Sequence, residues 1–503
     1  MKTALLVWGA SSGAGKSLLA TALCRWAARE GLDVAPFKAQ NMSNNARVVS
    51  GLDDEPGEIG SAQYFQALAA RVQPHVDMNP VLLKPEREAA SQVVVRGRVD
   101  AALSRRPWRE RSTQLSEAAR QSFERLAERF DVIVIEGAGS PAEINLAPLD
   151  YVNLGVARWA RERARCRALL VADIDRGGAF AHLYGTWALL PDDLRALLAG
   201  FVLNKFRGDA ALLAPAPARL HALTGVPVLG VLPMQRDHGL PEEDVLHAAT
   251  RTAGPATGPR VAIVAGPHVS NLDEFEPLAA CAAVRWARRA AELDGVDWIV
   301  LPGSKQVHGD LAWLRAHGLA DAIVAHARAG RPVLGICGGL QMLGQGLADP
   351  EGVDGEPYEL QPGLGLLPLV TRYAAPKRLR SGPVRFAPRL DAADGARGRW
   401  QALAGRAWSA YEIRCGRTTA TRADAMPALF DAEGHPVGWC GGPAHNVLGI
   451  ATHGLFEDAG ALCALLGQRV RSLDQRFDAL ADLIDHHLGA ATLRALLTTD
   501  HDT

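Results

Sequence analysis

The sequence lacks the features that mark secreted, membrane-spanning and nucleic-acid-binding proteins. Its seven cysteines are scattered, odd in number and without Cys-x-x-Cys spacing, which argues against a disulfide framework or a zinc site. No run of about 18 apolar residues is present, so no membrane span is expected. The 54 basic and 55 acidic residues leave a net charge of −1, without the basic excess typical of nucleic-acid binding. We therefore expect a cytoplasmic protein that does not bind nucleic acid and does not span a membrane.

Internal repeats and low-complexity tracts are also missing, and 503 residues exceed the roughly 250–300 that a single hydrophobic core supports. A stretch rich in Gly, Pro and Thr at 248–259 has no apolar period and predicts a linker. We expect domains at 1–247 and 260–465, followed by a helical tail at 466–503. Within the second domain, residues 372–400 are rich in Arg, Pro and Gly and predict a long loop or short antiparallel strands.

The strongest local pattern surrounds Cys337. An apolar strand at 333–336 leads into this cysteine and then into a predicted helix, and glycines stand two places before and two places after it. This spacing is typical of a nucleophile elbow, where glycine allows a sharp turn from strand to helix. The helix N-terminus favours the thiolate form. Cys337 is therefore the predicted nucleophile, although an arbitrary cysteine is more often a buried core residue.

A cysteine nucleophile needs a base, and His453 is the candidate. It follows another apolar strand and stands beside a glycine, which favours a catalytic role over that of a surface or core histidine. A further strand, beginning near Asp297, ends in a turn that contains Gly303. We predict that the N–H groups of Gly303 and Gly338 form an oxyanion hole.

The block from about 260 to 460 resembles the class I glutamine amidotransferase domain of cobyric acid and cobyrinic acid diamide synthases. Leu455 stands where most class I amidotransferases have a glutamate, and the cobyric acid variant shares this absence. Arg414 stands where the family usually has a histidine and is left out of the catalytic set. The resemblance rests on Leu-Pro-Gly-Ser-Lys at 301–305, Gly-Ile-Cys-Gly-Gly-Leu-Gln at 335–341, Tyr-Glu-Ile at 411–413 and Thr-His-Gly at 452–454.

A second strong pattern opens the chain, where an apolar strand leads into Gly-Ala-Ser-Ser-Gly-Ala-Gly-Lys-Ser at 9–17 and then into a helix. In such a loop the backbone N–H groups cradle phosphate oxygens, the lysine neutralises them and the serine hydroxyl can hold Mg²⁺. Ala10 stands where the strict pattern has glycine, an extension by one residue that resembles dethiobiotin-synthetase-like ligases. The predicted ATP-binding residues of the loop are Gly9, Gly13, Gly15, Lys16 and Ser17.

Three more polar residues follow predicted strands, at the sheet edge where doubly wound folds bind ligands. The segment around Lys38 resembles the one in which the family's lysine approaches the terminal phosphate. Glu136 ends an apolar strand, where its carboxylate can bind Mg²⁺ opposite the phosphate loop. Asn204 falls where dethiobiotin-synthetase relatives use an asparagine to read the nucleotide base, and the resemblance implies that role here.

Strands and helices alternate through both halves, which predicts two α/β domains with doubly wound, mostly parallel sheets. One would be a dethiobiotin-synthetase-like ATP-binding synthetase domain and the other a glutamine amidotransferase domain. The whole chain resembles the family of glutamine-hydrolysing adenosylcobyric acid synthases. That resemblance implies ATP, Mg²⁺, glutamine as nitrogen donor and a corrinoid substrate. The implied reaction amidates the b, d, e and g carboxylates of adenosylcobyrinic acid a,c-diamide in cobalamin biosynthesis, through phosphorylated carboxylates.

Two alternatives stay open, and the sequence indicates no particular oligomeric state. Cobyrinic acid a,c-diamide synthase performs the same chemistry on other carboxylates of the ring. Against it, Pro-Phe-Lys-Ala-Gln-Asn-Met at 36–42 and the segment 136–145 favour the cobyric acid branch. A partition-type nucleotide switch would use the phosphate loop for assembly. Such a switch would not need an intact elbow with a downstream histidine.

Overall fold

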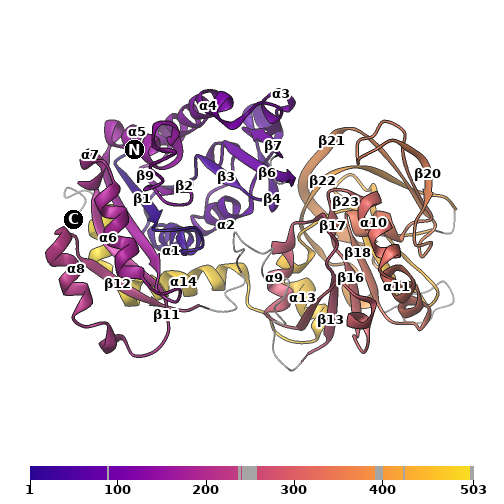
Figure 1. Ribbon diagram of the computed structural model, residues 1–503. Helices are drawn as coiled ribbons and strands as arrows, with labels where there is room; N and C mark the ends of the chain where they lie inside the picture. The colour runs from indigo at the N-terminus through magenta and orange to yellow at the C-terminus, as the bar shows by residue number, and fades with distance from the viewer. Residues whose placement is uncertain (88–89, 236–239, 241–257, 391–399, 423–424, 499–503) are drawn as a thin grey trace. The chain divides into compact units, whose positions relative to one another are not determined.

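A computed structural model describes residues 1–87, 90–235, 240, 258–390, 400–422 and 425–498. The chain divides into two compact units, which are described separately (Figure 1). The first contains Met1–Glu243 together with Asp474–Thr503, and the second contains Asp244–Leu473. Of the linker predicted at 248–259, all but the last two residues lie outside the described residues.

The first unit is built on a six-stranded parallel sheet in the order β12-β11-β10-β1-β9-β2. The strands are apolar along most of their length because helices cover both faces of the sheet. The chain proceeds in opposite directions from β1, so the carboxyl end of β1 is a topological switch point. The predicted doubly wound sheet is confirmed. Its strands are β1 (Thr3–Gly9), β2 (Val34–Phe37), β9 (Val132–Glu136), β10 (Arg165–Asp173), β11 (Leu198–Phe206) and β12 (Val228–Pro233).

The long helix α4 shows how the helices of this unit are held. Its buried residues include Leu115, Ala119 and Phe123, which recur every four residues on one face. Phe123 packs edge-on against Phe37 of β2, with ring centroids 5.5 Å apart. The helices are α1 (Lys16–Arg29), α2 (Ser61–Ala69), α3 (Ala101–Ser104), α4 (Trp108–Arg129), α5 (Val156–Arg163), α6 (Ala179–Leu189), α7 (Asp192–Arg195) and α8 (Ala216–Thr224).

Two small sheets lie outside the main sheet of the first unit. One has the order β3-β6-β7-β8 and the other pairs β4 with β5. The first of these sheets includes β3, which is the last part of the segment at 36–42 around Lys38. Their strands are β3 (Gln40–Met42), β4 (Ala46–Ser50), β5 (Pro56–Gly60), β6 (Val81–Arg87), β7 (Ala90–Val95) and β8 (Arg98–Val99).

The last two helices of the chain, α14 (Leu473–Leu488) and α15 (Ala490–Leu497), belong to the first unit. Arg25 of α1 is 1% exposed and donates to Asp478 of α14 at 2.9 Å. The Arg25 guanidinium also lies 5.7 Å from the centroid of the Phe477 ring. Of the tail predicted at 466–503, the part from Asp474 onward therefore belongs to the first unit and supplies packing helices to it. Residues 499–503 lie outside the described residues.

The second unit is built on an eleven-stranded sheet in the order β15-β13-β16-β18-β25-β24-β23-β21-β19-β20, with β22 paired to β21. The five strands from β15 to β25 are parallel, as predicted, and the pairings from β25 through β24, β23 and β21 to β22 are antiparallel. The strands are β13 (Arg260–Val264), β15 (Ala283–Ala287), β16 (Trp298–Leu301), β18 (Val333–Ile336), β19 (Gly346–Asp349), β20 (Tyr358–Pro362), β21 (Leu369–Phe386), β22 (Ala407–Ala420), β23 (Met426–Asp431), β24 (Pro436–Gly441) and β25 (Val447–Ile450).

The segment predicted at 372–400 as a loop or short antiparallel strands begins within one long antiparallel strand, β21, which has 18 residues, and residues 391–399 of the segment lie outside the described residues. It pairs with β22 along most of its length. The register of the pairing shifts between Tyr373 and Arg378. Pro376, which has no N–H to donate, lies within this shift and so does not interrupt the regular ladder. A separate ribbon pairs β14 (Val269–Ser270) with β17 (Gly303–Ser304). The helices are α9 (Glu276–Ala279), α10 (Val307–Ala316), α11 (Leu319–Arg328), α12 (Gly338–Leu343) and α13 (Ala459–Leu466).

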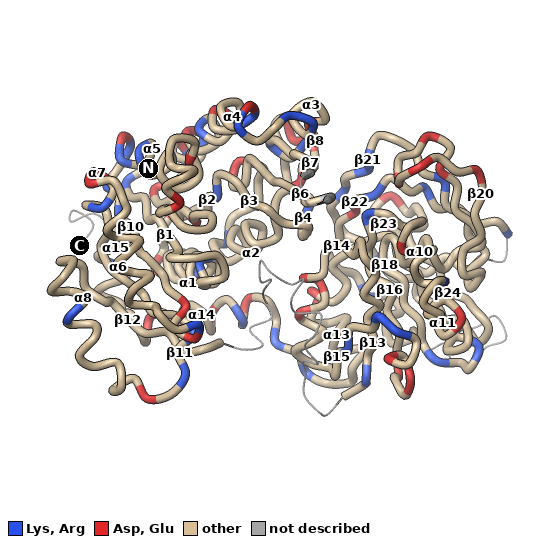
Figure 2. The backbone as a smooth tube through the Cα atoms, in the orientation of Figure 1, with Lys and Arg blue, Asp and Glu red and all other residues tan. Residues whose placement is uncertain are grey.

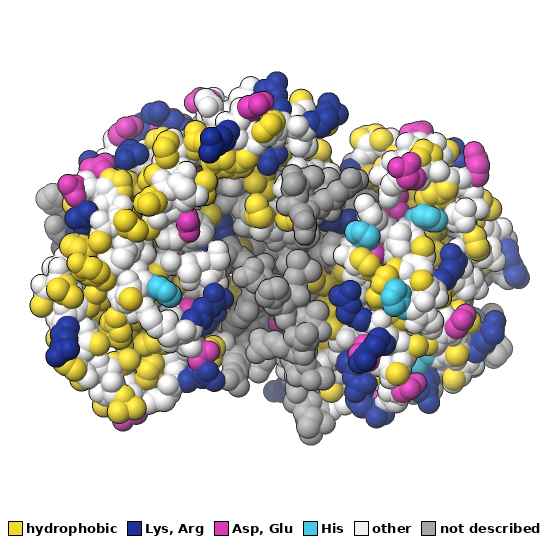
Figure 3. All heavy atoms as spheres, viewed as in Figure 1, with side chains coloured by type: hydrophobic (Ala, Val, Ile, Leu, Met, Phe, Trp, Pro, Cys, Tyr) yellow, Lys and Arg dark blue, Asp and Glu magenta, His cyan; other side chains and the backbone are white. Residues whose placement is uncertain are grey.

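Basic and acidic residues are interspersed along the backbone of each unit (Figure 2). On the face shown in Figure 3, apolar side chains also lie among charged ones. Large exposed apolar residues include Leu212, which is 82% exposed. Among the described residues, no helix is both long enough and apolar enough to cross a membrane.

Replacing Phe477 by alanine should destabilise the first unit. Phe477 is 1% exposed, and removing a buried phenyl group costs about 3–5 kcal/mol through lost burial and a residual cavity. Denaturant unfolding followed by tryptophan fluorescence measures the effect, and Leu212→Ala is the matched surface control. Equal unfolding midpoints for the two variants would contradict the packing of α14 described above.

Candidate active sites

Cys337 occupies the turn between β18 and α12, with φ 52° and ψ −102°. Positive φ is uncommon for a residue with a side chain and indicates local strain. The turn is held by the Cys337 N–H, which donates to the Ile450 carbonyl at 2.8 Å. A Cβ at Gly339 would lie 2.0 Å from the Leu301 carbonyl oxygen, so only glycine fits there. The predicted elbow geometry is therefore present, and the thiol is 6% exposed.

His453 reaches the same place because β25 pairs in parallel with β18. Its side chain is 1% exposed, and its Nδ1 lies 2.9 Å from Oε1 of Glu274. Cys337 is near enough to the imidazole to raise its pKa. Thiol, imidazole and carboxylate therefore form a continuous series, in which the carboxylate orients the ring.

Glu274 is the residue that the sequence did not identify. It lies in a short 3-10 turn (Leu272–Phe275) after β14, is fully buried, and also accepts from the Gly454 N–H at 3.3 Å. It thus supplies the carboxylate that is missing at Leu455. The sequence shows that position 455 lacks the usual glutamate. It does not indicate which acidic residue takes over the role.

The charges around His453 determine its protonation. Burial alone lowers the pKa of the imidazole, since it disfavours the charged form. The negative charges of Glu274 and Cys337, with hydrogen bonds to both, outweigh burial and raise the pKa to about 10. The imidazole is therefore protonated at neutral pH and can donate a proton.

Strand β22 lies against the Cys337 and His453 pair. The Tyr411 ring stacks on the imidazole, with centroids 5.1 Å apart and planes 18° apart. The Cys337 thiol donates to the Ile413 carbonyl across 3.9 Å. Arg414 instead donates to Glu412 at 2.6 Å, so this departure from the family pattern forms an ion pair within β22.

The turn after β16 meets the elbow, as predicted, but a different amide faces it. Lys305 N–H donates to the His268 carbonyl at 2.9 Å, on the β14 side. Successive N–H groups of an antiparallel strand point to opposite edges, so Gly303 N–H faces β14 and Ser304 N–H faces away. A Cβ on Gly338 would lie 2.7 Å from the Ser304 nitrogen. The geometry therefore favours Ser304 over Gly303 as the amide that acts with Gly338.

In the first unit, the loop after β1 has the shape of a phosphate cradle. Gly13 and Gly15 have φ values of 69° and 97°, which turn successive N–H groups inward. The Lys16 side chain is 2% exposed and donates to the carbonyls of Ser11, at 3.2 Å, and Gly139, at 3.1 Å. A Cβ at Gly9 would lie 2.9 Å from the Lys16 nitrogen. These contacts place the lysine across the mouth of the loop.

Glu136 lies at the centre of a buried polar network beside this loop. Its Oε1 accepts from the Ser17 hydroxyl and from the Lys38 ammonium, each at 2.8 Å. Its Oε2 accepts from Gln66 at 2.6 Å and from Gln63 at 3.2 Å. The structure thus brings together the predicted residues 17, 38 and 136. It adds two glutamines of α2 that spacing alone did not indicate.

The Ser17 and Glu136 oxygens fit a magnesium ion. Mg²⁺ prefers oxygen ligands and is commonly held by one carboxylate, a phosphate-loop hydroxyl and substrate phosphates. Both oxygens lie at the carboxyl edge of the sheet, next to the phosphate cradle.

Asn204, at the end of β11, lies against the same loop. It is 5% exposed and donates from Nδ2 to the Ala14 carbonyl at 3.0 Å. A Cβ on Gly15 would lie 1.9 Å from that nitrogen, so the two residues are in close contact. The amide thus supports the phosphate loop, and base recognition by Asn204 stays a prediction.

Family profiles match both halves of the chain. The CobQ/CobB/MinD/ParA nucleotide binding domain matches residues 5–245, and the CobB/CobQ-like glutamine amidotransferase domain matches residues 260–461. The fold and the two sites therefore define a glutamine-dependent ligase that also uses a nucleotide.

Similarity to curated proteins narrows this class. The chain is 58% identical to the cobyric acid synthase of Methylibium petroleiphilum, over 98% of this chain and 96% of that protein. It is 56% identical to the cobyric acid synthase of Variovorax paradoxus, over 98% and 99%. The chain belongs to the cobyric acid synthase family, whose enzymes perform amidation of small molecules in cobalamin biosynthesis.

Replacing Glu274 by glutamine should lower the pKa of His453 from about 10, because the charge that opposes burial is removed. Fewer imidazolium groups at neutral pH should slow glutamine hydrolysis at least about tenfold. NMR titration of the labelled imidazole measures the pKa, and a glutaminase assay measures the rate. Exposed Glu356→Gln serves as the control, and an unchanged titration of His453 would remove Glu274 from the site.

Proposed function

We propose that the chain amidates the b, d, e and g carboxylates of adenosylcobyrinic acid a,c-diamide to give adenosylcobyric acid. One observation carries the reaction type: a single chain contains both a buried thiol, imidazole and carboxylate series and a phosphate cradle with a carboxylate network. The identity of the corrinoid substrate and of its four carboxylates is inferred from the family to which the chain belongs. We infer that the reaction takes place in the cytoplasm.

In the amidotransferase unit, Cys337 would attack the side-chain amide carbon of glutamine. The carbonyl oxygen becomes anionic and accepts hydrogen bonds from the Gly338 and Ser304 N–H groups. His453 donates its proton to the leaving nitrogen, and ammonia departs as a thioester forms. Water then hydrolyses the thioester, with His453 as base, and releases glutamate. Glu274 keeps the imidazole oriented through both steps.

In the nucleotide-binding unit, the loop amides, Lys16 and Lys38 would bind the phosphates of ATP. Transfer of the terminal phosphoryl group to a substrate carboxylate depends mainly on positioning and charge neutralisation. Mg²⁺ held by Ser17 and Glu136 would neutralise phosphate charge there. Ammonia then displaces phosphate from the acyl phosphate and leaves a carboxamide.

The alternative within this chemistry is cobyrinic acid a,c-diamide synthesis, which uses two other carboxylates of the same ring. Two observations favour the cobyric acid reaction: the similarity over nearly the whole chain to cobyric acid synthases, and the segments at 36–42 and 136–145. A nucleotide switch without amidase chemistry is disfavoured by the complete Cys337, His453 and Glu274 series.

Mass spectrometry of the corrinoid tests the proposal directly. With ATP, Mg²⁺ and glutamine, adenosylcobyrinic acid a,c-diamide should be converted to a product in which four carboxylates have become carboxamides. If only the fully acidic ring is converted, and only at a and c, the chain is the diamide synthase instead.

Cys337→Ala separates the two units in the same assay. It should abolish synthesis from glutamine and leave synthesis from ammonium salt, because Lys16, Lys38 and Glu136 belong to the other unit. Lys16→Ala is the reciprocal variant and should lower synthesis from both nitrogen sources by about two to three decades. Near-normal synthesis by Lys16→Ala would show that ATP binds elsewhere.

A further inference from the structure

The ribbon of β14 and β17 carries the Ser304 amide to the elbow, and it is only two residues long on each strand. So short a ribbon has few backbone hydrogen bonds to fix its position. A Cβ on Gly303 would lie 3.0 Å from Cε1 of His453, so the ribbon also contacts the catalytic base. A small displacement of this ribbon would therefore move an oxyanion donor relative to the thiol.

One carboxylate, that of Asp310 on α10, holds both strands of this ribbon. Its Oδ2 accepts from the Ser304 hydroxyl at 2.7 Å, and its Oδ1 accepts from the His268 N–H at 3.1 Å. The His268 ring adds a third contact, with Nδ1 2.9 Å from Oδ1. All three bonds go to the ribbon segments, whereas a carboxylate in the first turn of a helix often binds its own helix instead.

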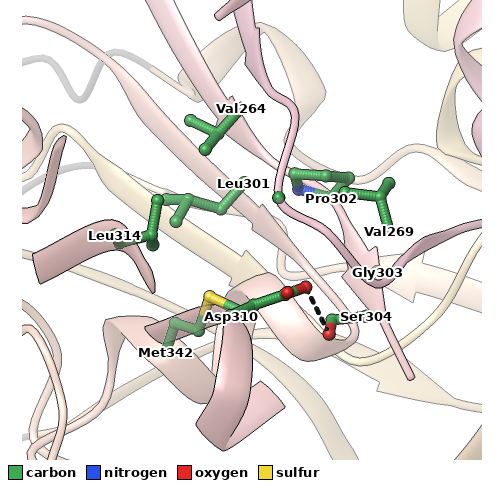
Figure 4. Close-up of a pocket in the computed structure, with 10 residues that line it drawn as sticks. Val264, Val269, Leu301, Pro302, Gly303, Ser304, Asp310, Leu314 and Met342 are labelled. Carbon is green, nitrogen blue, oxygen red and sulfur yellow. Dashed lines mark hydrogen bonds between the residues drawn. The ribbon is translucent and has the colours of Figure 1, made fainter. Parts of the chain in front are cut away.

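The carboxylate of Asp310 is buried and closely packed. Ser304 and Asp310 are the polar side chains among the residues lining a small open pocket, whose other walls include Leu301 and Met342 (Figure 4). Asp310 is 2% exposed, and hydrogen bonds shielded from water are stronger than exposed ones. A Cβ on Gly266 would lie 3.0 Å from the Asp310 carboxyl carbon, so glycine there leaves room for the carboxylate.

The helix that carries Asp310 is itself fixed at its N-terminus. The Asp354 carboxylate accepts from the N–H groups of Val307 at 3.2 Å and His308 at 3.0 Å. Asp354 is in turn held through its own N–H, which donates to Asp349 at 2.6 Å. Asp310 thus ties the ribbon to the first turn of α10, which follows β17 after two residues and has its own N-terminal contact to Asp354.

We propose that Asp310 is a positioning residue of glutamine hydrolysis, which sets the place of the Ser304 N–H through the Ser304 hydroxyl and His268. The inference rests on the proposed hydrolysis of glutamine at Cys337. Among the described residues the side-chain partners of Asp310 are Ser304 and His268, not Cys337 or His453, so it acts on the oxyanion and leaves the nucleophile intact. Its loss should therefore lower kcat for glutamine hydrolysis and leave KM nearly unchanged.

Three variants test this role: Asp310→Ala, Asp310→Asn, which keeps one acceptor oxygen, and Ser304→Ala, which keeps the backbone N–H but removes the hydroxyl. We expect Asp310→Ala to lower glutaminase kcat about ten- to hundredfold. Misplacing an oxyanion donor should lose much of the transition-state stabilisation that removing the donor would lose. Asp310→Asn and Ser304→Ala should lower glutaminase kcat by smaller factors. Asp321→Ala, an exposed aspartate in the first turn of α11, is the matched control.

Two further measurements separate positioning from general damage. Alkylation of Cys337 by iodoacetamide develops no oxyanion, so its rate should be unchanged in all the variants. Ammonia-dependent amidation uses the other unit and should also be unchanged. A full glutaminase kcat in Ser304→Ala and Asp310→Asn would overturn the inference, even if Asp310→Ala fails to fold. So would a loss of alkylation equal to the loss of kcat.

These outcomes differ from those that would overturn the proposed function. If Cys337→Ala still hydrolyses glutamine, the amidase assignment itself is wrong. If Cys337→Ala is inactive and the Asp310 and Ser304 variants behave like Asp321→Ala, the amidase assignment stands and only the positioning role is lost.

Discussion

Parallel strand pairing is the constraint on which the amidase site depends. β18 lies between β16 and β25, with Gly335 paired to Leu301 on one side and Ile336 paired to Ile450 on the other. Because the three strands run in the same direction, their carboxyl ends meet at one edge of the sheet. The elbow, the oxyanion turn and the histidine leave the sheet there. Segments far apart in the chain are thus brought within contact by backbone hydrogen bonds before any side chain contributes.

The nucleotide-binding unit uses the same constraint with different residues. β9 lies between β1 and β2, with Val7 paired to Glu136 and Phe37 paired to Ile135. Lys38 follows directly after β2, so the register alone makes its ammonium a neighbour of the Glu136 carboxylate. The phosphate loop begins where β1 ends, at the switch point of the sheet. Charge neutralisation of a bound phosphate therefore depends on strand order.

This constraint explains what could be predicted from the sequence. Residues directly after apolar strands, such as Cys337 and Lys38, were identified because strand ends are visible as patterns. Glu274 was missed because it lies in a 3-10 turn, and a turn carries no period that points to its partner. The sequence predicts Gly303 as an oxyanion donor, and the preference for Ser304 depends on which edge of a ribbon each N–H faces. The direction of each N–H follows from the pairing of β14 with β17. The sequence of neither segment alone predicts that pairing.

Both sites bury charges, and each buried charge has a partner. The Lys38 ammonium lies 2.8 Å from Glu136, and the His453 imidazole lies 2.9 Å from Glu274. Removing charges from water costs several kcal/mol per ion, so such pairs contribute little net stability, and apolar side chains of similar size would often pack better. Their retention at the carboxyl ends of the strands is explained by chemistry that requires a cation beside phosphate and an imidazole that holds a proton. The buried pairs therefore mark the places where the fold gives up packing stability so that charged groups stay fixed and shielded from solvent.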